Sequence, residues 1–218
     1  MQVEWQPSPN YAPRTEPIKY VIIHCTEVST DLEATQVYMD PKRELSTHYM
    51  IGYDGTITNF VRENMVAWHA GKSEWFEDSK LNQSSIGIEI SNMGEPGGCP
   101  AYSAVQYRAL GWLLKGIMTR HNITPECVLG HSDVAPDRKM DPGKHFNWGW
   151  LEAHNLAAPW VAPKVPAKTP AIDIIRMGGY RGDDEHVIAA FQRRHCQEVE
   201  NFGVLCPRTE WVLRKGKS

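Results

Sequence analysis

The stretch Tyr20-Val21-Ile22-Ile23-His24 is a short run of mostly β-branched apolar residues that ends in a histidine. A run of this kind is typical of a central strand that is buried on both faces of a sheet. The histidine would then lie at the carboxyl end of the strand, which is where open α/β sheets bind ligands. A core histidine hydrogen-bonded to the backbone is the ordinary alternative. We therefore predict an α/β fold, and from this pattern alone we would favour the core position for His24.

Helical and strand patterns alternate around this run. Helices are expected over 30–40 and 102–121, and strands over 46–51, 86–90 and 127–129. The dipeptide Asp54-Gly55 is a strong hairpin signal, so at least two neighbouring strands should be antiparallel. We therefore expect a central mixed β-sheet flanked by helices.

Length and composition limit the classes of function. With 218 residues, of which 41% are hydrophobic, the chain has room for one domain of ordinary size and a second, small one. A net charge of -3 gives no basic footprint for nucleic acid, and no run of about 18 apolar residues predicts a membrane span. The odd number of cysteines and the lack of a C-x-x-C pair favour buried thiols, and a Cys196–Cys206 bridge is left open.

The segment Gly130-His131-Ser132-Asp133-Val134-Ala135-Pro136-Asp137-Arg138-Lys139-Met140-Asp141-Pro142-Gly143 brings an imidazole, an ammonium and a carboxylate into one short stretch. Its glycines and prolines should break any helix or strand, so we expect a loop that holds side chains in place. Imidazole and carboxylate are good zinc ligands, and a catalytic zinc needs three protein ligands. His131 and Asp141 would supply two of them. A surface histidine and an ordinary Asp-Pro-Gly turn are the alternative.

Glu89 lies inside the apolar run Ile86-Gly87-Ile88-Glu89-Ile90. A carboxylate in such a strand costs free energy unless it is paired or has a function. In an arbitrary strand we would interpret it as a charge facing a sheet edge.

These segments together resemble a known family. The segment 130–143 resembles the C-terminal metal motif of the zinc-dependent N-acetylmuramoyl-L-alanine amidases, the amidase-2 family, related to phage T7 lysozyme and the peptidoglycan recognition proteins. Ile22-Ile23-His24 with Thr26 resembles the first metal motif, although Cys25 replaces the aromatic residue or Asn of many relatives. Ser85 to Ile90 with Asn92 resembles the strand of the catalytic glutamate. The motifs follow the order of the family and cover about residues 18–155.

The resemblance implies one Zn2+ per chain, held by His24, His131 and Asp141. It also implies that Glu89 is the general base and that Lys139 stabilises the oxyanion. The bond to be hydrolysed would be the amide bond between N-acetylmuramic acid, intact or 1,6-anhydro, and L-alanine of the stem peptide. The expected partner is therefore peptidoglycan or a muropeptide, and the enzyme is expected to be a monomer. The site of action would be the bacterial periplasm if a leader was removed, or else the cytoplasm, because residues 1–17 do not look like a signal peptide.

Two further stretches match the family. His48, in Ser46-Thr47-His48-Tyr49, is interpreted as a structural residue and not as a ligand. In Trp68-His69-Ala70-Gly71 the small residues would let the chain pass close to the substrate groove. For His69 itself, a surface position is an equally good interpretation.

Domain boundaries follow from the proline-rich composition of one segment and from what the resemblance implies for the others. We predict an N-terminal extension over 1–17, a zinc amidase catalytic domain over 18–156, a proline-rich linker over 157–170 and a small all-helical domain over 171–218. The last segment resembles a three-helix peptidoglycan-binding domain, mainly through Gly179-Tyr180 and Ala190-Phe191-Gln192-Arg193. A helical cap packed on the catalytic domain is the alternative.

Two other functions compete with amidase activity. Some relatives of the family recognise peptidoglycan without cleaving it, but the presence of all the expected site residues argues against such a receptor. A cysteine hydrolase could use Cys25 beside His24, yet neighbouring residues of a strand point to opposite faces.

Overall fold

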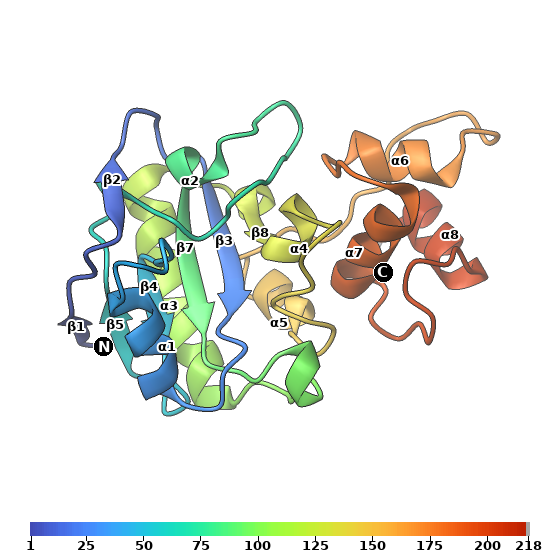
Figure 1. Ribbon diagram of the computed structural model, residues 1–218. Helices are drawn as coiled ribbons and strands as arrows, with labels where there is room; N and C mark the ends of the chain where they lie inside the picture. Colours follow the sequence, from blue (N-terminus) through green and yellow to red (C-terminus); the bar gives the residue numbers. More distant parts are fainter. Residues whose placement is uncertain (217–218) are drawn as a thin grey trace.

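The computed structural model describes residues 1–216 and contains a six-stranded sheet in the order β1-β5-β4-β7-β3-β8 (Figure 1). Its strands are β1 Val3–Trp5, β3 Tyr20–Cys25, β4 Tyr49–Ile51, β5 Ile57–Asn59, β7 Ser85–Ile90 and β8 Val128–Gly130. Within this sheet of the described residues, β4 and β5 pair antiparallel through the predicted hairpin and the other neighbours pair parallel. Strands β2 Tyr11–Pro13 and β6 Met65–Ala67 form a separate antiparallel pair. The prediction of a mixed sheet is confirmed.

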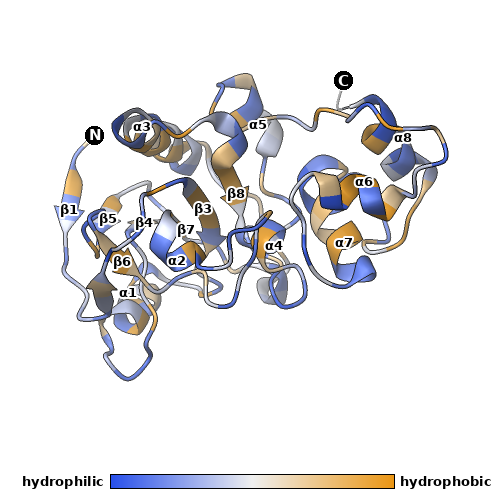
Figure 2. Ribbon diagram, turned by 90° about the horizontal axis from the view of Figure 1, so that it is seen from above, coloured by the Kyte–Doolittle hydropathy of each residue, from blue (hydrophilic) through white to orange (hydrophobic). Residues whose placement is uncertain are grey.

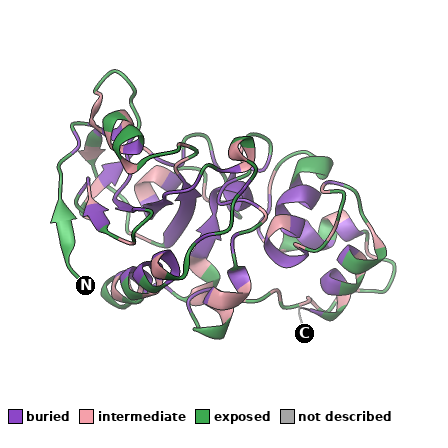
Figure 3. Cartoon of the chain, turned by 90° about the horizontal axis from the view of Figure 1, so that it is seen from below, coloured by how far each residue is buried: buried purple, intermediate pink, exposed green. Residues whose placement is uncertain are grey.

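Alternation along the central strands gives the sheet two different faces. Val21 and Ile23 of β3 pack with Ile86 and Ile88 of β7 beneath α3, Ala104–His121, in one hydrophobic core. The short helix α5, Trp148–Ala153, adds to this core. The opposite face carries the alternate residues of β3 and β7 and is covered in part by α1, Asp31–Met39. Figure 3 shows the central strands as buried and β1 as exposed.

Capping residues set the ends of α1 and α3. Thr30 and Glu33 form a capping box at the start of α1, and Ser103 and Gln106 form another at the start of α3. Asn122, directly after the predicted helix 102–121, ends α3 in the left-handed conformation. The expected helices are therefore present, with α3 beginning slightly later than expected because Ser103 is its cap.

Two local features differ from the sequence prediction. The segment after β8 is not a pure loop, because α4, His131–Val134, forms where glycine and proline were expected to prevent a helix. Asp133 stabilises this turn by accepting a hydrogen bond from the backbone N–H of Gly130 at 2.7 Å. In the N-terminal extension, β1 pairs with β5 in the six-stranded sheet and β2 pairs with β6 in the two-stranded sheet, so residues 3–5 and 11–13 are part of the folded domain.

The C-terminal segment forms three helices, as predicted. They are α6 Ala171–Met177, α7 Asp184–His195 and α8 Pro207–Lys215, and residues 154–170 before them contain no helix or strand. Figure 1 shows the three helices grouped beside α4. Apolar residues of α6 and α7, orange in Figure 2, share one core with Tyr20, Ile22 and Leu129 of the sheet. The sheet and the C-terminal helices are therefore joined by one continuous hydrophobic core.

The remaining elements are short. They are α2 Leu81–Ser84 and the 3-10 helices Glu95–Gly97 and Pro125–Cys127. Cys196 and Cys206 are both thiols, so the bridge left open by the sequence does not form. Within residues 1–216, no helix has the length and apolar character needed to cross a membrane.

Candidate metal centre

His24 and Glu89 lie side by side at the carboxyl ends of two parallel strands. They are register partners in β3 and β7, so both side chains project from the same face of the sheet. That face is opposite to the core beneath α3, which takes Ile23 and Ile88. Both His24 and Glu89 are buried. The strand pairing therefore brings these two predicted site residues together.

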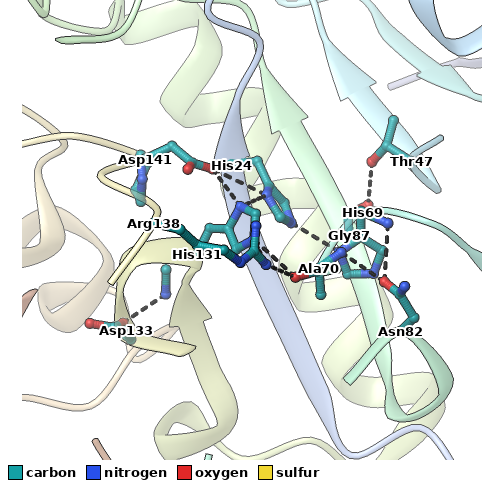
Figure 4. A network of polar contacts seen from close by, with 12 residues as sticks. His24, Thr47, His69, Ala70, Asn82, Gly87, His131, Asp133, Arg138 and Asp141 are labelled. Atoms are coloured by element: carbon teal, nitrogen blue, oxygen red, sulfur yellow. Dashed lines mark hydrogen bonds and ion pairs between the residues drawn. The ribbon is translucent and has the colours of Figure 1, made fainter. Parts of the chain in front are cut away.

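His131 and Asp141 complete a compact group with His24 (Figure 4). The Nδ1 atoms of His24 and His131 are 2.9 Å apart, and each lies 3.1 Å from Oδ2 of Asp141. His131 begins α4, and its neighbour Ser132 donates a backbone N–H to the Asp141 carbonyl at 2.9 Å. This bond closes the segment 131–141 on itself and holds both ends at one place.

The three atoms form a triangle that suits a metal ion. A tetrahedral zinc site with bonds of about 2.0–2.1 Å has ligand-to-ligand edges of roughly 3.3 Å, close to the separations found here. Asp141 Oδ1 and Glu89 Oε2 are buried and have no hydrogen-bond partner among the described residues. Two nitrogen lone pairs, a carboxylate and nearby unsatisfied oxygens are a donor set that could hold a metal.

Electrostatics keeps His24 and Asp141 in the protonation states that metal ligands need. Burial, helped by the neighbouring His131, lowers the pKa of His24 to about 4, so its imidazole is neutral at neutral pH. Burial alone would raise the pKa of Asp141, but the contacts with His131 and His24 hold it well below its usual range. The group therefore presents a neutral imidazole and a carboxylate.

Glu89 lies in the same pocket but outside the triangle. Burial, and then the charge of Asp141, raise its pKa to about 8. The Tyr38 hydroxyl of α1 hydrogen-bonds to the Glu89 carboxyl group, while Oε2 has no partner among residues 1–216. A buried carboxyl group with a pKa near neutrality is suited to accepting and releasing a proton.

The centre opens onto two adjoining cavities. An inner pocket of about 120 Å3 is lined by the triangle residues, Glu89 and Lys139. A wider groove of about 440 Å3 shares His69, His131 and Lys139 with it and continues past Trp68 and Arg138. Lys139 therefore borders both the inner pocket and the groove.

The segment 69–70 contacts both imidazoles from behind, and the sequence did not predict this. His69 Nδ1 lies 2.9 Å from Nε2 of His24, and the Ala70 carbonyl lies 3.2 Å from Nε2 of His131 (Figure 4). His69 is buried, so its interpretation as a surface residue is wrong. The sequence contained one indirect signal for this contact. Gly87 alternates with Ile88 along β7, and its lack of a side chain leaves room for the His69 ring.

Two other sequence interpretations can be compared with the structure. His48 stays outside the triangle, accepts the backbone N–H of Gly87 at 3.0 Å and faces the Met65 carbonyl, which agrees with a structural role. Cys25 packs in the core beneath α3, and burial raises the pKa of its thiol. A thiol in this state is a poor nucleophile, which argues against the cysteine hydrolase.

Comparison with known proteins defines the class. The profile of the N-acetylmuramoyl-L-alanine amidase family (Amidase_2) matches residues 14–144, more than half of the chain. This range contains the three triangle residues as well as Glu89 and Lys139. The chain therefore belongs to the N-acetylmuramoyl-L-alanine amidase family and is a hydrolase.

Individual relatives agree with this assignment. The chain is 33% identical over 207 residues to the N-acetylmuramoyl-L-alanine amidase AmiD of Escherichia coli, covering 80% of this chain and 74% of AmiD. It is 38% identical over 105 residues to the 1,6-anhydro-N-acetylmuramyl-L-alanine amidase AmpD of Haemophilus influenzae, which covers 48% of this chain and 55% of AmpD. The second alignment spans only about half of either protein.

Solved structures extend the likeness to the C-terminal helices. E. coli AmiD, in complex with anhydro-N-acetylmuramic acid-L-Ala-D-gamma-Glu-L-Lys, matches with a TM-score of 0.78 and 28% identity over 95% of this chain and 90% of that chain. AmpDh3 of Pseudomonas aeruginosa, in complex with anhydromuramic pentapeptide, matches with a TM-score of 0.79 and 28% identity over 92% and 91%. A match over 95% of the chain must include most of residues 171–216.

Proposed function

We propose that this amidase is a zinc enzyme that hydrolyses the amide bond between N-acetylmuramic acid and L-alanine in peptidoglycan fragments, in wall degradation or recycling. The observation that carries the proposal is the triangle of His24 Nδ1, His131 Nδ1 and Asp141 Oδ2 beside the buried Glu89. The amidase names of the relatives, and the muropeptides bound in AmiD and AmpDh3, support the substrate class.

Each residue has a defined part in this proposal. His24, His131 and Asp141 would hold the zinc ion, which when bound supplies Lewis acidity that polarises the carbonyl and makes water a better nucleophile. Glu89 accepts a proton from the attacking water and delivers it to the nitrogen as the C–N bond breaks. Lys139 faces the carbonyl oxygen and stabilises its negative charge in the tetrahedral transition state. The products are a lactyl carboxylate and the free amine of L-alanine.

The substrate preference is proposed from the relatives. The AmpD name specifies a 1,6-anhydro sugar and both bound ligands contain an anhydro form of muramic acid, which favours the anhydro form for this chain too. We expect the chain to act as a monomer. For the site of action in the cell, the periplasm and the cytoplasm both stay as predictions.

The test combines metal analysis with hydrolysis of defined substrates. The purified protein should contain about one zinc per chain, release the peptide from an anhydromuramoyl peptide, lose activity with a chelator and regain it with Zn2+. Intact and anhydro substrates should be compared at equal concentration. Metal bound with no hydrolysis of either would favour the non-catalytic receptor, and activity that survives chelation would exclude a metal enzyme.

The role of the C-terminal helices is a separate proposal. Their predicted function is to bind the wall, and exposed apolar side chains such as Trp211 are available for it. The core that they share with the sheet supports a structural function as well. We expect residues 171–216 to stabilise the catalytic part even when the substrate is a small soluble fragment.

A further inference from the structure

The two imidazoles of the triangle each have a second nitrogen that faces the segment 69–70 (Figure 4). Because Nδ1 of His24 points to the centre of the triangle, a metal there would take its lone pair, and the proton would lie on Nε2. That N–H then donates to Nδ1 of His69 at 2.9 Å. The same reasoning makes Nε2–H of His131 a donor to the Ala70 carbonyl at 3.2 Å.

The chain of donors continues behind His69 in one direction. With Nδ1 of His69 accepting from His24, its own proton lies on Nε2 and points to the Ser85 hydroxyl at 3.2 Å. The Ser85 hydroxyl donates in turn to the Leu81 carbonyl. Each polar atom in this chain of hydrogen bonds acts as either a donor or an acceptor, and all the residues in it are buried. The tautomer of His24 is thus set by groups that do not touch the metal position.

A side chain from α2 holds the supporting segment in place. Asn82 Oδ1 accepts the backbone N–H groups of His69 at 3.1 Å and of Ala70 at 2.7 Å. The His69 ring lies against Gly87, where a Cβ would approach its Cγ to 2.5 Å. The ring therefore has little room to turn. The same two hydrogen bonds hold the backbone of Ala70, whose carbonyl also accepts a hydrogen bond from Nη2 of Arg138.

From these contacts we propose that His69 and Asn82 are positioning residues of the metal centre. His69 fixes the tautomer and orientation of His24, and Asn82 fixes the backbone that supports both imidazoles. Partners of this kind raise the basicity of ligating imidazoles, and their loss typically weakens metal binding about 10–100-fold. The inference rests on the proposed zinc site and adds the groups that preorganise it.

The experiment measures the zinc dissociation constant by competition with a chelator, in protein first stripped of metal. His69→Leu removes the acceptor and is expected to raise the constant about 10–100-fold, whereas His69→Gln, whose amide oxygen can accept from His24, should restore part of the affinity. Asn82→Leu should weaken binding, and Asn82→Asp, which keeps an acceptor oxygen, should weaken it less. Gly87→Ala should displace the ring and act in the direction of His69→Leu.

Structural damage is separated from positioning by two further readouts. Thermal unfolding of the metal-free variants reports stability alone, and the visible spectrum of the Co2+-substituted proteins reports the geometry of the site. The proposal requires a changed spectrum and weaker binding in His69→Leu, with recovery in His69→Gln. Wild-type affinity and spectrum in both His69→Leu and Asn82→Leu, with or without a lower unfolding temperature, would overturn it. A wild-type protein that binds no zinc would instead overturn the proposed function.

Discussion

Nη1 of Arg194 lies 2.6 Å from Oδ2 of Asp133, in a contact where both side chains are buried. The two residues are 61 positions apart, one in α7 and the other in the turn that begins with His131. The Tyr180 hydroxyl donates to the other oxygen of Asp133 at 3.0 Å. The C-terminal helices therefore hold the turn that carries one of the proposed zinc ligands.

Replacing Arg194 tests this connection. Arg194→Met should lower the free energy of unfolding by about 3–5 kcal/mol, because it leaves the Asp133 carboxylate buried without its cationic partner. Denaturant unfolding measures the change. The control is Arg176→Met, which breaks the exposed pair with Asp184 and should cost about 1 kcal/mol or less. Equal, small effects of the two variants would mean that the buried pair contributes little.

A chain ending after Pro163 tests the shared core. A module that only tethers the enzyme to the wall could be removed without effect on a soluble substrate. Removal here would expose Tyr20, Ile22 and Leu129 and take both side-chain partners from Asp133. We expect the shortened chain to unfold at a clearly lower temperature and to bind zinc more weakly, measured by calorimetry and chelator competition. Full stability and full activity on a soluble muropeptide would show an independent module.

The sequence predicts the features that depend on neighbouring residues, and it misses those that depend on contacts between residues far apart in the chain. His24, Glu89 and the segment 130–143 were singled out because they lie in short local motifs that resemble those of the family, and the helix ends were predicted because caps are local. The strand Val3–Trp5 was missed, since three exposed residues form a strand only through pairing with β5. The contacts of His69 with His24 and of Arg194 with Asp133 join distant segments, and no local pattern reports them.

Lys139→Ala tests the proposed oxyanion contact. The side chain borders the inner pocket and the groove but is not part of the triangle, so zinc content should stay unchanged. Turnover should fall about 100-fold or more with a smaller change in KM, because the charge that Lys139 stabilises forms only in the transition state. Steady-state kinetics on a soluble muropeptide measures both constants. An effect confined to KM would assign Lys139 to substrate binding.

The raised pKa of Glu89 makes a prediction about stability in the metal-free protein. The pKa of Glu89 is about 8 in the folded chain against an ordinary value of 4.5, so between these pH values the folded state holds more protons than the unfolded state. Stability contributed by this group is therefore present at low pH and is lost as pH rises toward 8. Glu89→Gln removes the titrating group while keeping its shape. With a chelator present, the variant should gain stability relative to the wild type steadily from pH 5 to pH 8.

Thermal unfolding of both proteins across that pH range measures the difference. The comparison at pH 5 is the internal control, because Glu89 is then largely protonated and resembles the amide. In the zinc-loaded enzyme the same substitution should keep the metal and abolish most turnover, since an amide cannot accept the proton from water. If the difference in stability between the two proteins were the same at every pH, Glu89 would already be ionised in the folded chain. Glu89 could then accept a proton from water without first losing one of its own.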